Sequence, residues 1–248
     1  MMLLKSPAEI AVMREAGRIT ASTLRVVGEA VVPGITTQEL DEIASEHIRQ
    51  AGGKPAFLGY HGFPATLCVS VNDEVVHGIP GKRRLKEGDI VSVDCGVIVD
   101  GYYGDAAMTF PVGAVSEEAR NLMDVTRASL EAAIARCRPG MRLGDVGSAV
   151  QGIVERAGFS VVREYVGHGI GRSMHEEPQV PNFGRAGTGL QLRPGMVIAI
   201  EPMVNAGGYA VRSLDDGWTV VTADGSLSAH FEHTVAITAD GPMVLTLE

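Results

Sequence analysis

Two aspartates, Asp94 and Asp105, flank a tight turn in the stretch IVSVDCGVIVDGYYGDAAMTF, residues 90–110. The dipeptide Asp100-Gly101 suits a two-residue type I′ turn, because both residues tolerate a positive φ. In that register Asp94 lies opposite Ala107, which makes Asp94 and Asp105 diagonal neighbours on one face, roughly 7–8 Å apart at the backbone. Two carboxylates on an apolar ribbon repel each other unless a cation lies between them. The hairpin therefore indicates half of a metal site, although two aspartates facing water at strand ends would give the same pattern.

Three further candidates lie in the second half of the chain. His168 stands among three glycines in VGHGIG, and glycine there permits close approach of backbone or ligand. Glu201 follows the apolar run MVIAI and precedes Pro202, which stops a central strand. Glu232 lies in the strand-like run 230–237, where an unpaired buried carboxylate would be costly. Each has an ordinary structural alternative, such as a satisfied core histidine, but we interpret the residues as one set.

Four carboxylates and one imidazole form a hard, oxygen-rich donor set. This composition suits manganese, iron(II), cobalt or zinc and needs no thiolate. The four negative charges would offset two divalent cations. Two ions roughly 3.5–4 Å apart could lower the pKa of a shared water and hold both oxygens of a tetrahedral intermediate. The predicted chemistry is metal-assisted hydrolysis.

Two helices and a strand should precede the hairpin. A capping box at Ser6–Glu9, with proline at the first helical position, begins a helix that ends before Pro33-Gly34. Thr36 begins a second helix, which stops at Gly52-Gly53. A strand is expected at Ala65–Val71, ahead of the hairpin.

The same order recurs further along the chain. Ser116 begins a helix, and a second helix runs from Pro139-Gly140 to Ala157-Gly158. The Pro-Gly and Ala-Gly pairs of the two halves match at a single shift of 106 residues. We therefore predict an internal duplication with pseudo-twofold symmetry, with pseudo-repeats at about 6–110 and 115–240. The alternative is that Pro-Gly simply ends helices.

Composition narrows the class of protein. A chain of 248 residues with 45% hydrophobic and 21% charged residues can bury a large core, and we expect one α/β domain over residues 1–248 whose halves share a sheet. The net charge of −9 argues against a general DNA or membrane binder. No signal peptide or membrane span is recognisable, and three unpaired cysteines fit a reducing, cytoplasmic setting. The basic run 82–86 is interpreted as a solvated turn; a contact with an anionic partner such as the ribosome is left open.

Five motifs in this order resemble those of a type I methionine aminopeptidase. They are HGIP (77–80), VDCGVIVDGYYGDAAMTF (93–110), GHGIGRSMHEEP (167–178), IEPM (200–203) and EHT (232–234). The resemblance runs from the first helix to the last strand. It implies the pita-bread fold, an internally duplicated, pseudo-twofold α/β fold with a mixed curved sheet and helices on the outside.

The resemblance also implies a ligand set for two divalent metal ions. Asp105 and Glu232 would bridge the ions, Asp94 would hold one of them, and His168 with Glu201 would hold the other. Glu201 would in addition act as general base toward a bridging water or hydroxide and pass the proton to the leaving amine.

Two more histidines acquire roles through the resemblance. His175 would hydrogen-bond the scissile peptide group and help to stabilise the oxyanion. His77 would contact the substrate near the scissile bond and assist proton transfer. A buried structural imidazole is the alternative for His77.

The resemblance places six residues around the methionine side chain of the substrate. They are Tyr60, His61, Phe63, Cys68, Met174 and Trp218. Aromatic edges and a soft sulfur neighbour serve a thioether well, although ordinary core aromatics would look the same. Bacterial relatives often carry cysteine at Phe57, tyrosine at Phe63 and phenylalanine at Met174, so the resemblance does not fix the shape of this pocket.

The implied activity is removal of the initiator methionine from nascent proteins and peptides whose second residue is small. Two other functions are known for proteins of this fold. A proline-directed peptidase of the same fold usually carries an extra N-terminal domain, for which we expect no room here. A non-enzymatic binding protein on this scaffold has typically lost metal ligands, whereas every ligand position is filled. We expect a monomer that acts on nascent polypeptide N-termini.

Overall fold

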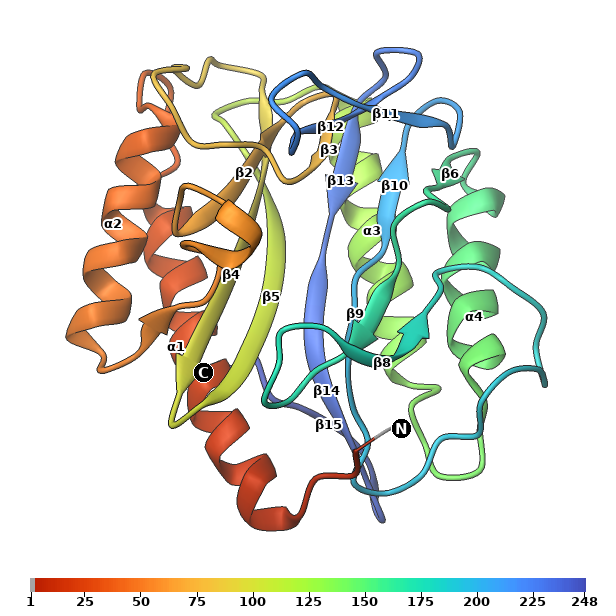
Figure 1. Ribbon diagram of the computed structural model, residues 1–248. Coiled ribbons are helices and arrows are strands. Elements are labelled where there is room, and N and C mark those ends of the chain that lie inside the picture. The colour runs from red at the N-terminus through yellow and green to blue at the C-terminus, as the bar shows by residue number, and fades with distance from the viewer. Residues whose placement is uncertain (1–2) are drawn as a thin grey trace.

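The computed structural model describes residues 3–248 and consists of helices packed against the outside of a curved sheet (Figure 1). The helices are α1 (Pro7–Ala30), α2 (Thr37–Gln50), α3 (Glu117–Ile134) and α4 (Leu143–Arg156), with a short 3-10 turn η1 (Tyr60–Gly62). The strands of the first half are β1 (Lys54–Pro55), β2 (Leu67–Val71), β3 (Glu74–Val76), β4 (Ile90–Val99) and β5 (Tyr102–Pro111). Those of the second half are β6 (Ser160–Val161), β7 (Gly167–Gly169), β8 (Glu176–Val180), β9 (Val197–Ile200), β10 (Met203–Asn205), β11 (Val211–Ser213), β12 (Val220–Thr222), β13 (Ser228–His230), β14 (Glu232–Thr238) and β15 (Gly241–Val244).

The main sheet joins the two halves of the chain. Its order is β1-β4-β5-β14-β9-β7-β8, with β2 beside β4 and β15 beside β14, so the halves meet where β5 pairs with β14. Helix α1 packs on β4 and β5, whereas α3 packs on β9, β10, β13 and β14. The expected α/β architecture with outer helices is confirmed. Every strand pairing within residues 3–248 is antiparallel, however, where a mixed sheet was expected. Short connections require this for β4–β5, β7–β8 and β14–β15. The strands that join the two halves, β5 and β14, are antiparallel as well.

The helix starts are confirmed. Ser6 accepts from the Glu9 backbone while the Glu9 carboxylate reaches back to Ser6, and Thr36 and Glu39 form the same capping box. Ser116 caps α3 through the Ala119 backbone. Reciprocal caps of this kind satisfy donors that a helix N-terminus would otherwise leave unpaired.

The two halves repeat the same local order. Helices α2 and α4 have bounds that differ by 106 residues, and so do the strands β1 and β6 that follow them. One core cluster lies under α1 and α2, and another lies under α3 and α4. These spacings agree with the expected shift, and the duplication itself stays a prediction.

The β4–β5 hairpin has the register that its turn residues predict. Asp100 and Gly101 both have positive φ, 48° and 79°, as a type I′ turn requires. Val99 pairs with Tyr102, and Asp94 pairs with Ala107. The run 230–237, by contrast, is not one strand: Phe231 interrupts it, since β13 pairs with β10 in a three-stranded sheet while β14 pairs with β5 and β9.

The missing side chain of Gly104 lets α1 lie directly on β5. A Cβ added at Gly104 would lie 2.6 Å from the backbone nitrogen of Gly17, which is closer than real Cβ contacts. We therefore expect Gly104→Ala to destabilise the fold by about 2 kcal/mol through overpacking, lowering the thermal midpoint by roughly 4–8 °C for a chain of this size. Gly152→Ala is the control, because its Cβ would meet only Arg156 Nη1 at 3.5 Å and alanine favours a helix interior. Thermal melts of both variants test this, and equal midpoints would contradict it.

The basic run 82–86 is mostly exposed, as a solvated turn requires. Two of its side chains are engaged with the chain itself: Arg83 pairs with Glu74 at 2.8 Å, and Arg84 donates to the Gly34 carbonyl at 2.6 Å. This engagement holds the turn against the body of the protein.

Composition gave expectations about membrane-spanning helices and about the three cysteines. Across residues 3–248 no helix is both long and apolar enough to cross a membrane. Cys68, Cys95 and Cys137 are all buried free thiols, as an odd and unpaired set predicts.

Candidate active site

One transverse row of the main sheet carries two of the predicted ligands. Cys68 pairs with Asp94, Asp94 pairs with Ala107, and Ala107 pairs with Glu232 across β2, β4, β5 and β14. Asp105 stands two residues before Ala107 on β5. Because alternate residues of a strand share a face, the row and Asp105 face the same side of the sheet. The diagonal placement of Asp94 and Asp105 expected from the turn is the one observed.

The remaining two candidates come from β7 and the end of β9. His168 pairs with Ala199, and Glu201 follows directly after β9. His168 Nε2 lies 3.6 Å from Glu201 Oε1 and 3.8 Å from Asp105 Oδ2. One ligand atom each from Asp105, His168 and Glu232 all lie within 4.8 Å of one another. Side chains from both halves of the chain therefore converge on a volume the size of a metal site.

The His168 ring is oriented by its own backbone neighbour. Nδ1 lies 2.9 Å from the carbonyl oxygen of Gly169, which accepts only if Nδ1 carries the proton. Nε2 then keeps a free lone pair toward the carboxylates. Burial lowers the pKa of His168 to about 4, so the ring is neutral as a ligand must be.

The electrostatics of the cluster fit a cation. Burial raises the pKa of Asp105 to about 7, and burial with mutual repulsion raises the pKa values of Asp94, Glu201 and Glu232 well above the usual carboxyl range. Oδ1 of Asp94, Oδ1 of Asp105 and Oε1 of Glu232 are buried without a hydrogen-bond partner within the described part of the chain. Buried polar atoms are ordinarily satisfied, so these oxygens indicate a group that binds between them. Divalent metal ions satisfy such oxygens, and the residues present fit them.

A cavity of about 420 Å³ opens onto the cluster. It is lined by Phe57, Tyr60, His61, Phe63, Cys68, His77, Asp94, Asp105, His168, His175, Glu201, Trp218 and Glu232. The structure thus brings together the five candidate ligands, the two candidate catalytic histidines and five of the six residues expected around the methionine side chain. One side of the cavity is charged and the other is apolar and aromatic, with Phe63 and Trp218 in edge-to-face contact at 5.0 Å between ring centroids.

Met174 is the exception among the expected pocket residues. It is 1% exposed and packs in the core cluster behind the cavity instead of lining it, whereas Phe57 does line it. A Cβ placed on Gly96 would lie 2.7 Å from Phe57 Cε1 and 2.8 Å from Met174 Cε. The two side chains therefore share the space over Gly96, and the larger ring at Phe57 reaches the cavity surface.

The histidines near the cavity mouth lie on unusual backbone. His61 and His77 have positive φ, 49° and 60°, which is costly for residues other than glycine and is concentrated at functional sites. Burial lowers the pKa of His77 to about 4. Tyr60 Oη lies 2.7 Å from His175 Nδ1, and the His175 ring lies 4.3 Å from that of His168 between centroids.

A buried ion pair holds the loop that carries His175. Lys5 Nζ lies 2.5 Å from Glu176 Oε2, and Glu176 Oε1 accepts from the backbone nitrogens of Arg172 and Ser173 at 2.9 and 3.3 Å. The segment before α1 is thereby tied to the loop from which His175 projects into the cavity.

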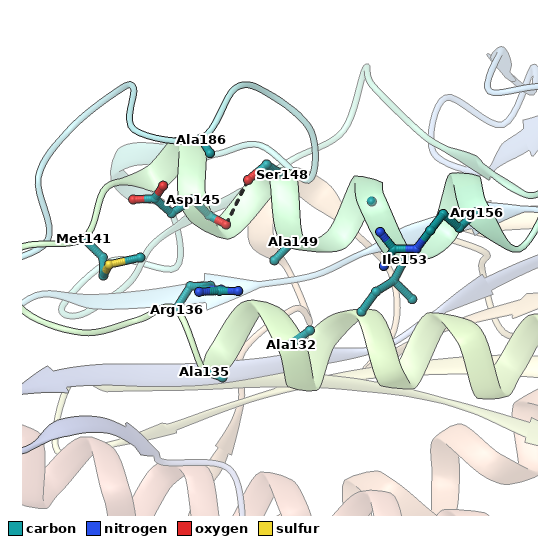
Figure 2. A pocket seen from close by; sticks show the side chains of 11 residues that line it. Ala132, Ala135, Arg136, Met141, Asp145, Ser148, Ala149, Ile153, Arg156 and Ala186 are labelled. Carbon is teal, nitrogen blue, oxygen red and sulfur yellow. Dashed lines mark hydrogen bonds between the residues drawn. The ribbon is translucent and has the colours of Figure 1, made fainter.

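A larger hollow of about 540 Å³ lies elsewhere, between α3 and α4 (Figure 2). Its only lining carboxylate, Asp145, already accepts from the backbone nitrogens of Arg142 and Gly187. No histidine or cysteine lines it. The larger hollow therefore lacks the cluster of carboxylates and imidazoles that lines the smaller cavity.

The sequence and the fold of this chain are similar to those of known metallopeptidases. The model of metallopeptidase family M24 matches residues 11–239. A methionine aminopeptidase from Clostridium perfringens is 57% identical over 247 residues, covering 100% of this chain and 99% of that protein. The crystal structure of methionine aminopeptidase from Thermotoga maritima superposes with a TM-score of 0.99 at 51% identity, covering both chains completely.

A more distant structural match covers only part of the other protein. The prolidase from Pyrococcus furiosus has a TM-score of 0.79 at 23% identity, and the match covers 99% of this chain but 65% of that one. At this identity the match shows a shared fold alone. The full-length matches at high identity are decisive, and the chain belongs to metallopeptidase family M24 and, within it, to the methionine aminopeptidases.

Proposed function

We propose that this protein hydrolyses the N-terminal methionine from proteins and peptides whose second residue is small, using two divalent metal ions. The observation that supports this most directly is the convergence of four buried or half-buried carboxylates and one imidazole in a cavity that is also lined by aromatic side chains. The high identity of full-length relatives named methionine aminopeptidase supports the same activity.

Five residues would hold the metal ions: Asp94, Asp105, His168, Glu201 and Glu232. Asp105 and Glu232 lie on the two strands that join the halves of the sheet, so they would hold the ions together with ligands from both halves. When bound, two such ions polarise the scissile carbonyl and lower the pKa of a shared water.

Side chains of the protein would transfer the protons and orient the scissile peptide. Glu201 would take the proton from the attacking water and deliver it to the leaving amine. Tyr60 Oη lies 2.7 Å from His175 Nδ1. If Nδ1 accepts from this hydroxyl, Nε2 carries the proton and would donate it to the developing oxyanion. His77, neutral because of burial, would contact the peptide nitrogen beside the scissile bond.

The apolar side of the cavity would hold the methionine side chain. Phe57, Phe63 and Trp218 provide aromatic surface, and Cys68 lies beside the metal ligands through its pairing with Asp94. Thioethers contact aromatic edges favourably. Tyr60 and His61, at the half-exposed mouth, would contact the backbone around the scissile bond, while Met174 would shape the pocket from behind.

A peptide panel tests this activity. After chelation and dialysis, the protein is titrated in turn with Mn²⁺, Fe²⁺, Co²⁺ and Zn²⁺ and assayed on Met-Ala-Ser and on a Gly-Pro peptide. We expect no turnover without metal, methionine release with at least one ion, and activity that saturates at two equivalents per chain.

Three outcomes would contradict parts of this proposal. Turnover of the Gly-Pro peptide alone would indicate a proline-directed peptidase. Saturation at one equivalent would contradict a dinuclear centre, and full activity after chelation would contradict metal dependence. A cytoplasmic location, a monomeric state and a contact between the basic run 82–86 and the ribosome stay predictions.

A further inference from the structure

His230 is a buried imidazole next to the candidate ligands that the proposed mechanism leaves unused. It ends β13 and is 1% exposed. Its backbone N–H donates to Thr109 Oγ1, and Thr109 Oγ1 donates to its carbonyl, each at 2.9 Å. On its other side β13 lies beside β10 (Figure 1), where His230 pairs with Met203. The main chain at His230 is therefore held from both sides, and Nε2 of its ring lies 3.8 Å from Glu201 Oε2.

The ring nitrogen nearest to the site has no partner. His230 Nε2 is fully buried and forms no hydrogen bond with any residue from 3 to 248. Its nearest acid is Glu201, whose Oε2 lies 3.8 Å away. The other oxygen of that carboxylate, Oε1, lies 3.6 Å from His168 Nε2. The Glu201 carboxylate therefore lies between two imidazoles, with one oxygen toward each.

A carboxylate that acts as general base has to be held in one orientation. The terminal torsion of a glutamate is broad, so the rotamer alone does not fix the plane of the carboxylate. A general base must present one defined oxygen, and a hydrogen bond to the other oxygen is the usual means of holding it. A separation of 3.8 Å is too long for a hydrogen bond, but bonds of this kind commonly tighten only when the site is loaded.

We propose that His230 is a positioning residue for peptide hydrolysis, donating from Nε2–H to Glu201 Oε2 and so directing Glu201 Oε1 toward His168 and the ligand cluster. The inference rests on the proposed function, because it assigns a partner to the general base of that reaction. His230 does not touch the substrate and acts only through Glu201.

Two substitutions separate this role from simple packing. His230→Leu keeps an apolar side chain of related size but removes the donor, and we expect kcat on Met-Ala-Ser to fall about 10–100-fold with KM nearly unchanged. His230→Gln restores a side-chain N–H donor, and we expect it to recover most of kcat. Metal content per chain should equal that of the wild type in both variants.

His233→Leu is the matched control. His233 is also a partly buried imidazole, but its Nδ1 bonds Thr246 Oγ1 at 2.8 Å, outside the cavity. We expect this variant to lose thermal stability while its kcat stays within about 3-fold of wild type, as for changes away from catalytic groups. A similar kcat loss in both leucine variants would overturn the positioning role.

A spectroscopic measurement tests the hydrogen bond without turnover. In ¹⁵N-histidine-labelled, metal-loaded protein, the His230 ring signals are assigned by their loss in His230→Gln. We expect the Nε2–H tautomer with a slowly exchanging proton, whereas the Nδ1–H tautomer would overturn the proposal.

The kinetic outcomes distinguish two failures. If the wild type releases no methionine, the proposed function fails, and the tautomer measurement still decides whether His230 donates to Glu201. If the wild type is active and His230→Leu matches it, or if the leucine variant loses metal in proportion to activity, the positioning role alone is overturned.

Discussion

Asp105→Asn is expected to abolish metal-dependent methionine release while leaving the fold intact. Asp105 is the only candidate ligand that lies both within 4.8 Å of the donor atoms of Glu232 and His168 and diagonally across the hairpin from Asp94. A neutral amide at this position would offer a weaker ligand and would remove one of the four charges that we propose hold the cations. We expect a loss well above the roughly 10–100-fold typical of residues that only support a ligand.

The same substitution should have the opposite effect on the stability of the metal-free protein. Burial raises the pKa of Asp105 because its charged form is poorly solvated beside other carboxylates, so a neutral side chain relieves repulsion. The thermal midpoint of chelated Asp105→Asn should therefore equal or exceed that of the chelated wild type, and added metal should raise it less. Mass action stabilises the metal-loaded wild type by about 2.7 kcal/mol when free metal is at 100 times Kd.

Asp124→Asn is the surface control for this experiment. Asp124 is exposed on α3 and pairs only with Arg127 at 2.7 Å. Exposed pairs contribute little, so activity and midpoint should stay near wild-type values. Near-normal, metal-dependent activity in Asp105→Asn would refute the ligand assignment. A midpoint far below wild type would show that Asp105 is needed for folding. Glu232→Gln would then take its place as the variant that tests the proposed ligand cluster.

The parts of the site that the sequence predicts are those encoded locally. A type I′ turn at Asp100-Gly101 sets the register of a hairpin without any distant contact, and the register places Asp94 opposite Ala107. Capping boxes at Ser6 and Thr36 likewise depend on residues three positions apart. The motifs along the chain supplied the remaining ligands, since no local rule brings β7 and β14 into one sheet with β5.

The parts that the sequence did not predict depend on tertiary packing. Met174 was expected in the pocket wall, but the space over Gly96 is shared with Phe57, and the larger ring occupies the cavity surface. Which of two apolar side chains faces a cavity depends on their joint packing, so a pattern of residue types cannot decide it.

His230 was missed for a related reason. It stands two residues before Glu232, a spacing that places both on one face of a continuous strand, and this was the signal available in the sequence. The chain breaks at Phe231 and moves from one sheet to the other, yet the ring still reaches Glu201. A run of β-type residues does not reveal such a break, because both segments have the same composition.

His175→Ala is expected to lower kcat by about 10²–10³, the usual cost of removing one oxyanion donor, without lowering metal content. The ring lies beside His168 but comes from a loop held by the buried Lys5–Glu176 pair, and Tyr60 Oη fixes its Nδ1 at 2.7 Å. A truncated side chain would leave the candidate ligands in place and remove only the donor that we propose faces the carbonyl of the substrate. Metal analysis alongside steady-state kinetics on Met-Ala-Ser checks this.

Tyr60→Phe separates the donor from its orientation. The phenyl ring keeps the packing of Tyr60 but cannot hold His175 Nδ1, so both tautomers become accessible and part of the population loses the Nε2–H donor. We expect a smaller fall in kcat than for His175→Ala, and no further fall when both changes are combined, because they act on one hydrogen bond. His47→Ala, on α2 and outside the cavity, removes a contact of 2.9 Å with Ser22 Oγ and should leave kcat unchanged. A loss of metal from His175→Ala that matches its loss of activity would make His175 a ligand, whereas additive effects in the double variant would mean that Tyr60 contacts the substrate independently.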